Sequence, residues 1–255
     1  MIRKIGTLAL FLASLATFAQ TDAPSSIPAA TPPPAKRYSR PDIPGTFAVE
    51  IGVNRAMGTP SKFDQGFWGS RSLNVYYTYD MRILKSRLFF VPGVGFSFER
   101  YKLVNGRTLG YANANANEVS MLTGIEAGYP VNLKKSMLVT NYFEVPVELK
   151  YMSRPEDPNR SFRISVGGRI GYMYDAMTKV KYSENGENKK VKNNQNYNLT
   201  RLRYGLSAHV GIGNISLFSY YNFTPLFEDK KGPKNDDATN TTINTFTIGL
   251  SIASF

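Results

Sequence analysis

The sequence predicts an all-β protein, namely an eight-stranded antiparallel transmembrane β-barrel with up-and-down meander topology. Three observations predict it: eight segments in which apolar and polar residues alternate, connections that are alternately long and short, and an N-terminal targeting segment. A period of two places successive side chains on opposite faces of a strand. A strand that crosses a bilayer in a barrel needs ~9–11 residues, with one face toward lipid and the other toward the lumen.

The clearest alternating segment is residues 162–176, FRISVGGRIGYMYDA. Its even-numbered residues are mostly apolar or aromatic, whereas its odd-numbered residues include Arg163, Arg169 and Asp175. The segment therefore has one apolar and one charged face. It exceeds the ~5–6 residues usual for strands of soluble sheets. By itself this pattern would also suit a soluble sandwich or a lipocalin-like barrel. The lengths of the connections between segments distinguish a membrane barrel from these soluble folds.

Every predicted strand has an apolar face built from residues two positions apart. Pro92 lies within the third segment, where it predicts a bulge or a bend because proline donates no ladder hydrogen bond. In chain order the segments, with examples of their apolar residues, are 46–54 (Phe47, Ile51), 72–83 (Leu73, Val75), 88–101 (Phe90, Phe96), 137–151 (Phe143, Val145), 162–176 (Ile164, Val166), 200–213 (Leu202, Leu206), 214–227 (Ile215, Leu217) and 243–255 (Ile248, Leu250).

The connections alternate between long and short. The short ones are 84–87, 153–161 and 213–214, and the long, polar ones are 56–71, 102–136, 183–199 and 228–242. Outer-membrane barrels have short periplasmic turns, longer extracellular loops and an even number of strands. A soluble sandwich has no reason to sort its loops in this way. The sequence therefore predicts a multi-pass barrel, residues 46–255, in the cell outer membrane of a Gram-negative bacterium, with both termini in the periplasm.

Residues 1–19 are expected to be a signal peptide. Arg3 and Lys4 precede a short apolar run, and Thr17-Phe18-Ala19 supplies a small-x-small site with the cut before Gln20. Elsewhere in the sequence there is no apolar run of the ~18 or more residues that a membrane-spanning helix requires. Residues 20–45 contain seven prolines and predict an extended periplasmic linker, which is either a tether or a remnant with no role.

Composition narrows the function classes further. The chain has 255 residues with 16 Tyr and 16 Phe, residue types that favour strands. It has no cysteine, which excludes disulfides, thiolate metal sites and a cysteine nucleophile. The formal net charge is +12, but neither a basic helix nor a nucleic-acid motif accompanies it, so the charge favours an anionic membrane surface rather than nucleic acid.

Charged residues on the polar faces of the strands predict a charge network in the lumen. An eight-stranded barrel is just wide enough for side chains to fill, so we expect a salt-bridged plug. A narrow small-solute pore is the alternative. The predicted lumen residues are Glu50, Asp80, Arg82, Glu99, Glu144, Glu148, Lys150, Arg163, Arg169, Asp175, Arg201, Arg203 and His209.

The sequence favours a non-enzymatic protein. A hydrolase needs a nucleophile, a base and an orienting group within reach. His209 is the single histidine, and its position predicts an inward side chain near the periplasmic end. A lipid-active outer-membrane enzyme, which would act near the outer rim, remains the second alternative. The spacing of acidic residues and histidine predicts no metal site, and no glycine-rich loop predicts a phosphate-binding cofactor.

The first long loop contains three aromatic residues, Phe63, Phe67 and Trp68. We expect them either to form a contact surface for a partner or to belong to the interfacial aromatic belt. Residues 187–192 of the third long loop are basic and are candidates to contact lipopolysaccharide phosphates.

Four sequence features carry a resemblance to a known family: LFFVPGVGF at 88–96, FEVPVELKY at 143–151, VGGRIGY at 166–172, and the C-terminal Phe255. The chain resembles the small outer-membrane barrels of Bacteroidota, the PorT-like or outer membrane protein β-barrel domain group. Phe255 resembles the signal read by the barrel-assembly machinery, although the apolar residues of the last segment, from Phe246 to Ile252, have the opposite parity.

The resemblance implies an accessory role in a secretion assembly. Taken together, the sequence predicts a structural or interaction protein of the cell envelope. Its expected partners are outer-membrane lipid and lipopolysaccharide, the barrel-assembly machinery and an envelope protein, and no cofactor is expected.

Overall fold

The computed structural model describes residues 45–111, 118–235, 237 and 239–254. The predicted signal peptide, the predicted linker apart from Gly45, and Phe255 lie outside the described residues. Two short 3₁₀ helices, Phe67–Gly69 and Pro158–Arg160, interrupt the connections. None of the helices within the described ranges is long and apolar enough to cross a membrane.

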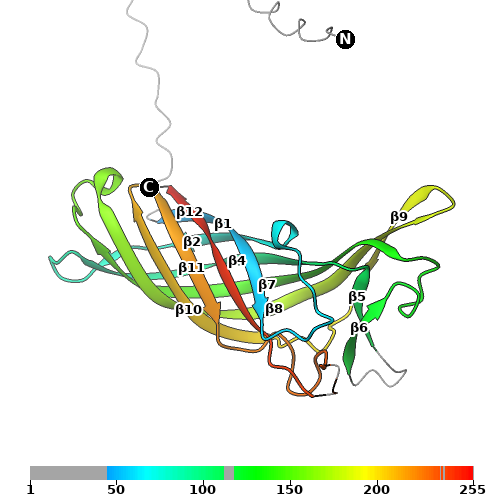
Figure 1. Cartoon of the computed structure of the whole chain (residues 1–255). Coiled ribbons are helices and arrows are strands. Elements are labelled where there is room, and N and C mark those ends of the chain that lie inside the picture. Colours follow the sequence, from blue (N-terminus) through cyan, green and yellow to red (C-terminus); the bar gives the residue numbers. More distant parts are fainter. Residues whose placement is uncertain (1–44, 112–117, 236, 238, 255) are drawn as a thin grey trace, which may run out of the picture. The chain divides into compact units, whose positions relative to one another are not determined.

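Eight antiparallel strands close into a ring, as predicted. Each ring strand pairs with its sequence neighbours in the ring, and β12 returns to pair with β1, so the topology is an up-and-down meander (Figure 1). The ring strands are β1 (Thr46–Met57), β2 (Arg71–Thr78), β4 (Leu88–Leu103), β7 (Leu133–Met152), β8 (Phe162–Glu184), β10 (Leu202–Ile212), β11 (Ile215–Asn222) and β12 (Asn244–Ser254).

Four further strands lie outside the ring. β5 (Arg107–Tyr111) and β6 (Val119–Thr123) form a separate hairpin, and β9 (Glu187–Asn193) extends the sheet along the far half of β8. β3 (Met81–Arg82) pairs with the start of β4. β9 was not predicted, because it falls in a segment that the sequence indicates only as a long loop. An extra hairpin was one of two possibilities for the apolar segment 121–129 of the second long loop, the other being a longer fourth strand, and β6 overlaps the start of that segment.

The second predicted strand is in two pieces, with β2 ending at Thr78 and β3 beginning at Met81. The break lies opposite Pro92 of β4. Proline has no N–H, so the ladder across from it cannot be completed, although the Tyr79 amide still donates to the Pro92 carbonyl at 3.0 Å. The predicted irregularity therefore appears in the neighbouring strand, while β4 itself runs through Pro92 without a break.

A β-bulge in β8 exchanges its two faces. Asn141 of β7 pairs with Asp175, but the next residue, Tyr142, pairs with Met173, so Tyr174 is the extra residue. Before the bulge the odd-numbered residues of β8 point into the barrel, and after it the even-numbered residues do, as the buried Thr178 and Val180 show. Simple alternation from residue 162 therefore fails beyond Met173.

The connections sort by length between the two ends of the barrel. Residues 83–87, 153–161 and 213–214 form the short ones, and 58–70, 104–132, 185–201 and 223–243 form the long ones. The short turns share their end with the start of β1 and the end of β12, whereas β5, β6 and β9 lie at the opposite end (Figure 1). We call these the turn end and the loop end.

The outer wall of the ring is apolar. Every ring strand contributes large apolar side chains that are more than one third exposed, and we call this surface the apolar belt. The inward positions are instead polar and buried, the reverse of a protein folded in water. One member of the belt from each ring strand, in order, is Ile51, Leu73, Phe96, Val145, Val166, Leu206, Leu217 and Leu250.

Candidate functional site

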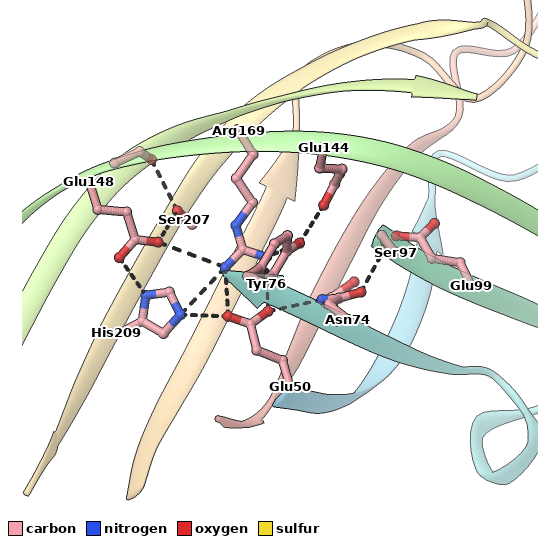
Figure 2. Close-up of polar contacts among 12 residues, drawn as sticks. Glu50, Asn74, Tyr76, Ser97, Glu99, Glu144, Glu148, Arg169, Ser207 and His209 are labelled. Carbon is pink, nitrogen blue, oxygen red and sulfur yellow. Dashed lines mark hydrogen bonds and ion pairs between the residues drawn. The ribbon is translucent and has the colours of Figure 1, made fainter. Parts of the chain in front are cut away.

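Charged side chains gather inside the barrel because alternate residues of the ring strands point inward. The innermost of them are at most 2% exposed: Glu50, Glu99, Glu144, Arg169 and Arg203. With Glu148 and His209 they form what we call the lumen charge cluster, drawn largely in Figure 2. Each ion comes from a position that alternation assigns to the lumen, on β1, β4, β7, β8 or β10.

Arg169 organises the half of the cluster nearer the turn end. Its two terminal nitrogens, Nη1 and Nη2, each donate to one carboxylate oxygen of Glu50 at 2.9 Å (Figure 2). Nη1 also donates to the Tyr76 hydroxyl at 3.0 Å. This two-pronged geometry is the strongest form of arginine–carboxylate pairing, and burial strengthens it further.

His209 lies between two carboxylates. Its Nε2 is 2.8 Å from Glu50 Oε1 and its Nδ1 is 3.3 Å from Glu148 Oε2 (Figure 2). The hydroxyl groups of Ser165 and Ser207 donate to the Glu148 carboxylate at 2.8 and 3.2 Å. Each histidine nitrogen therefore faces a carboxylate acceptor, as suits a doubly protonated imidazolium, and Arg169 Nη2 is a more distant neighbour of Nε2 at 3.4 Å.

Arg203 organises the half nearer the loop end. Its Nη2 lies 2.7 Å from Glu144 Oε1, and its Nη1 lies 2.9 Å from Glu99 Oε1. The guanidinium carbon is 3.5 Å from the centre of the Tyr142 ring. Tyr101 donates its hydroxyl proton to Glu99 at 2.7 Å. The cation is thus held by two carboxylates and an aromatic face.

Neutral polar residues join the two halves into one network. The Tyr76 hydroxyl accepts from Arg169 and donates to Glu144 (Figure 2). Asn74 donates to Glu50 at 2.9 Å and accepts from the Ser97 hydroxyl at 2.8 Å. The predicted set of lumen residues contains only charged side chains and therefore lacks Tyr76, Asn74 and Ser97. The signal that could have found them is their position on the inward-facing sides of β2 and β4.

The lumen charges balance when His209 is protonated. A buried charge persists only with a compensating partner, so this balance matters for stability. Near the turn end Lys150 pairs with Asp80 at 2.6 Å, and Arg163 is 6% exposed. The set then holds five carboxylates (Glu50, Asp80, Glu99, Glu144 and Glu148) and five cations (Lys150, Arg163, Arg169, Arg203 and His209).

Three predicted lumen residues lie elsewhere. Asp175 follows the bulge and faces outward, where it accepts from the Asn141 amide at 2.8 Å. Arg82 is exposed on β3, and its side chain donates to the Ser86 carbonyl at 2.7 Å within the short turn. Arg201 is exposed just before β10 begins. In each case the prediction assumed unbroken alternation, across the bulge for Asp175, across the break between β2 and β3 for Arg82, and before the start of β10 for Arg201.

A hydrophobic core lies at the loop end of the barrel. All four long connections contribute to it, and it continues onto the inward Tyr101 and Tyr142, which contact the charge cluster. Backbone hydrogen bonds tie the loops together, for example from Val119 to Lys231 at 3.0 Å. We call this core the loop cap; its loop residues are Phe63, Leu109, Val119, Met121, Tyr197, Leu199, Leu226, Phe227 and Ile243.

The three aromatic residues of the first long loop separate into two groups. Phe63 is 2% exposed and belongs to the loop cap, so its predicted role as an exposed contact residue is wrong. Phe67 is half exposed and Trp68 is 91% exposed, and their rings meet edge to face at 5.3 Å. The free aromatic surface of this loop therefore consists of Phe67 and Trp68.

The turn end holds a small cavity of about 70 Å³ beneath the charge cluster. Glu148, Lys150, Arg163 and His209 are among its lining residues. A space of this size suits a few water molecules rather than an organic ligand. Over the described residues, histidine, aspartate and glutamate side chains nowhere form a group of three or more suited to a metal ion.

Comparison with known proteins places this barrel in a family. The family described as outer membrane protein beta-barrel domain matches residues 18–228. The chain belongs to this family. Its place is accordingly the outer membrane, which agrees with the apolar belt around the ring. No curated protein matches the chain.

The chain is also similar to solved structures, among them those of two bacterial proteins. One is Ail, the attachment invasion locus protein of Yersinia pestis, with 16% identity over 82% of this chain and 99% of that chain and a TM-score of 0.34. The other is Neisserial surface protein A (NspA), with 12% identity over 82% of this chain and 95% of that chain and a TM-score of 0.36.

Proposed function

We propose that this protein is a non-conducting, non-enzymatic outer-membrane barrel with a structural or interaction role in the cell envelope. The observation that supports the proposal is the contact between the loop cap and the lumen charge cluster, where Tyr142 of the apolar core lies against Arg203. A barrel that transports solutes keeps a continuous polar path, and packed apolar side chains and buried ion pairs both work against such a path.

The charge cluster resists opening. Arg169 and Arg203 are buried and each holds at least one carboxylate at 2.9 Å or less. Separating such a buried pair leaves an uncompensated charge, which costs about 3–5 kcal/mol. Several of these pairs share partners, so a path for ions requires many contacts to break together.

The arrangement around His209 argues against catalysis. Ser165 lies 3.3 Å from Nδ1, which resembles part of a nucleophile–base pair. However, its hydroxyl donates to Glu148, and both ring nitrogens of His209 face carboxylates. A general base needs an accepting nitrogen, which this geometry does not offer.

The proposed orientation places the turn end and both termini in the periplasm and the long loops outside the cell. This follows the usual division between short and long connections in outer-membrane barrels. The exposed pair Phe67 and Trp68 then faces outward and suits a protein contact. The sequence resemblance to PorT-like proteins of Bacteroidota supports an accessory role in a secretion assembly.

Planar-bilayer recording of the purified protein tests the closed lumen. We expect no steady unitary openings in 1 M KCl, at protein levels for which protease protection confirms insertion into parallel liposomes. A general porin recorded in the same membranes is the positive control. Reproducible openings of fixed size that persist after repurification would overturn the proposal and favour the small-solute pore.

A further inference from the structure

Like charges face one another across β7, β8 and β9, where these strands extend toward the loop end beyond the apolar belt. Lys135 of β7 is in register with Lys181 of β8, which is in register with Lys190 of β9. The next row, two residues closer to the ring, pairs Lys179 with Lys192. Cations directly opposite one another destabilise a sheet, so this arrangement needs a compensating partner.

The pattern continues down to the apolar belt. Lys102 of β4 is in register with Met137 of β7, which is in register with Lys179 of β8, so Lys102 and Lys179 lie in the same row across the sheet. In the next outward-facing row toward the belt, Arg71 of β2 is in register with Arg100 of β4. We call these eight side chains the cationic ladder, and none of them is buried: Arg71, Arg100, Lys102, Lys135, Lys179, Lys181, Lys190 and Lys192.

The ladder faces outward rather than into the barrel. Its strand neighbours Ser136, Leu138 and Val180 have the opposite parity and are buried on the inner side. Ion pairs with carboxylates involve none of the eight ladder residues in the described part of the chain. The nearby Lys189, by contrast, does pair with Glu184, at 2.5 Å.

The ladder begins where the aromatic edge of the apolar belt ends. Phe96 and the bulge residue Tyr174 meet edge to face at 6.2 Å on the outer wall. Arg100 lies four residues beyond Phe96 on β4, about 14 Å along the strand at ~3.4 Å per residue. Aromatic girdles mark the membrane–water interface, so the lower rows of the ladder, from Arg71 and Arg100 to Lys102 and Lys179, lie closest to the lipid headgroups, and the upper lysine rows extend outward from them.

We propose that the cationic ladder binds phosphorylated headgroups of the lipid leaflet that surrounds the loop end. Neighbouring strands are about 4.8 Å apart and rows about 7 Å apart, so one headgroup phosphate can contact cations of two strands. Lysine and arginine are the side chains that bind phosphate most strongly. The identity of this leaflet as the outer one rests on the proposed orientation.

Lipid binding by the purified full-length protein in detergent tests the proposal. The probe is diphosphorylated lipid A, measured by native mass spectrometry against the same lipid with both phosphates removed. The ladder variant combines Arg100→Gln, Lys102→Gln and Lys179→Gln, three of the cations nearest the aromatic edge of the belt. The matched control combines Lys230→Gln, Lys231→Gln and Lys234→Gln, which removes the same charge from the loop between β11 and β12.

We expect the ladder variant to bind the diphosphorylated lipid at least tenfold more weakly and the control variant to bind it as the wild type does. Dephosphorylated lipid should bind all three proteins equally weakly. Equal weakening in both triple variants, or binding independent of the phosphates, would overturn the proposal. So would inorganic pyrophosphate that binds as tightly as the lipid, because the site would then serve a soluble phosphate.

Two checks keep the outcome interpretable. Unchanged heat-modifiable mobility on gels shows that the variants retain the folded barrel. Lipid binding in detergent does not depend on how the chain is oriented in cells. A wrong lipid-binding proposal would therefore be detected in the detergent experiment, and a wrong orientation would be detected separately on intact cells.

Discussion

At the scale of single residues, the interior depends on two arginines that are almost fully buried. Arg169 holds Glu50 with both prongs of its guanidinium, and Arg203 bridges Glu144 and Glu99. Removing one such cation leaves its carboxylates buried and uncompensated, which is far more costly than losing an exposed charge.

We expect Arg203→Met to lower the free energy of unfolding by about 3–5 kcal/mol, because Glu99 and Glu144 lose their shared cation. The matched control is Arg201→Met, the same change two residues away on an exposed side chain, which should stay within about 0.5 kcal/mol of the wild type. Urea unfolding of the barrel in detergent, followed by gel mobility, measures both. Equal effects of the two changes would contradict a buried network.

Alternation along each strand was enough to place Glu50, Glu144 and Arg203 inside the barrel. It failed for Asp175, since a bulge adds one residue and exchanges the faces of the strand. It also could not show that Phe63 is buried, because loop burial depends on contacts between segments far apart in the chain.

At the scale of elements, close strand packing depends on glycines at inward positions. Gly95 of β4 lies beside Tyr76 of β2, whose ring occupies the space that a side chain would need. A Cβ at Gly95 would be 2.2 Å from the Val75 carbonyl oxygen and 2.5 Å from the Tyr76 ring carbon Cδ1. Tyr76 also joins the two halves of the charge cluster, so displacing its ring would disturb its hydrogen bonds with Arg169 and Glu144.

Gly95→Ala should therefore destabilise the barrel by about 1–3 kcal/mol, the usual cost of overpacking. Gly168→Ala provides the control, since the atom nearest to its added Cβ is the Gly205 carbonyl oxygen at 3.7 Å. The same urea titration compares the two variants. A loss for Gly168→Ala as large as that for Gly95→Ala would show that the contact with Tyr76 is not the cause.

The number, order and approximate bounds of the ring strands were predictable because each carries a strong period-two pattern. Their ends were less so: β8 reaches Glu184 rather than residue 176, since pairing with β7 and β9 continues beyond the apolar belt. The two strands of the β5–β6 hairpin could not be located from the sequence, because they are short and lack a clear polar face.

At the scale of the whole molecule, the orientation in the membrane can be tested directly. The chain has no cysteine, so each introduced thiol is the single one present. We expect Trp68→Cys, at the loop end, to react with a membrane-impermeant maleimide on intact cells. Lys85→Cys, in the short turn between β3 and β4, should react only after the outer membrane is disrupted.

Labelling of Lys85→Cys on intact cells, with protection of Trp68→Cys, would reverse the proposed orientation. Both positions are exposed in the folded chain, so a lack of reaction shows protection by the membrane rather than burial in the protein.

The closed ring could be predicted from the strand pattern, whereas the loop cap could not, because its residues come from four separate connections.

The barrel closes along a seam between its first and last strands. Phe47 lies opposite Ser254 and Val53 opposite Ile248, a pairing of residues about two hundred positions apart. Pairing residues so far apart in the sequence has a high entropy cost and is slow, so the pairing of β12 with β1 is the last step in closing the barrel. Until β12 arrives, β1 and β11 each present unpaired backbone groups that hydrocarbon cannot satisfy. An unfolded chain therefore cannot enter the bilayer strand by strand and must be shielded until β12 is available to pair with β1.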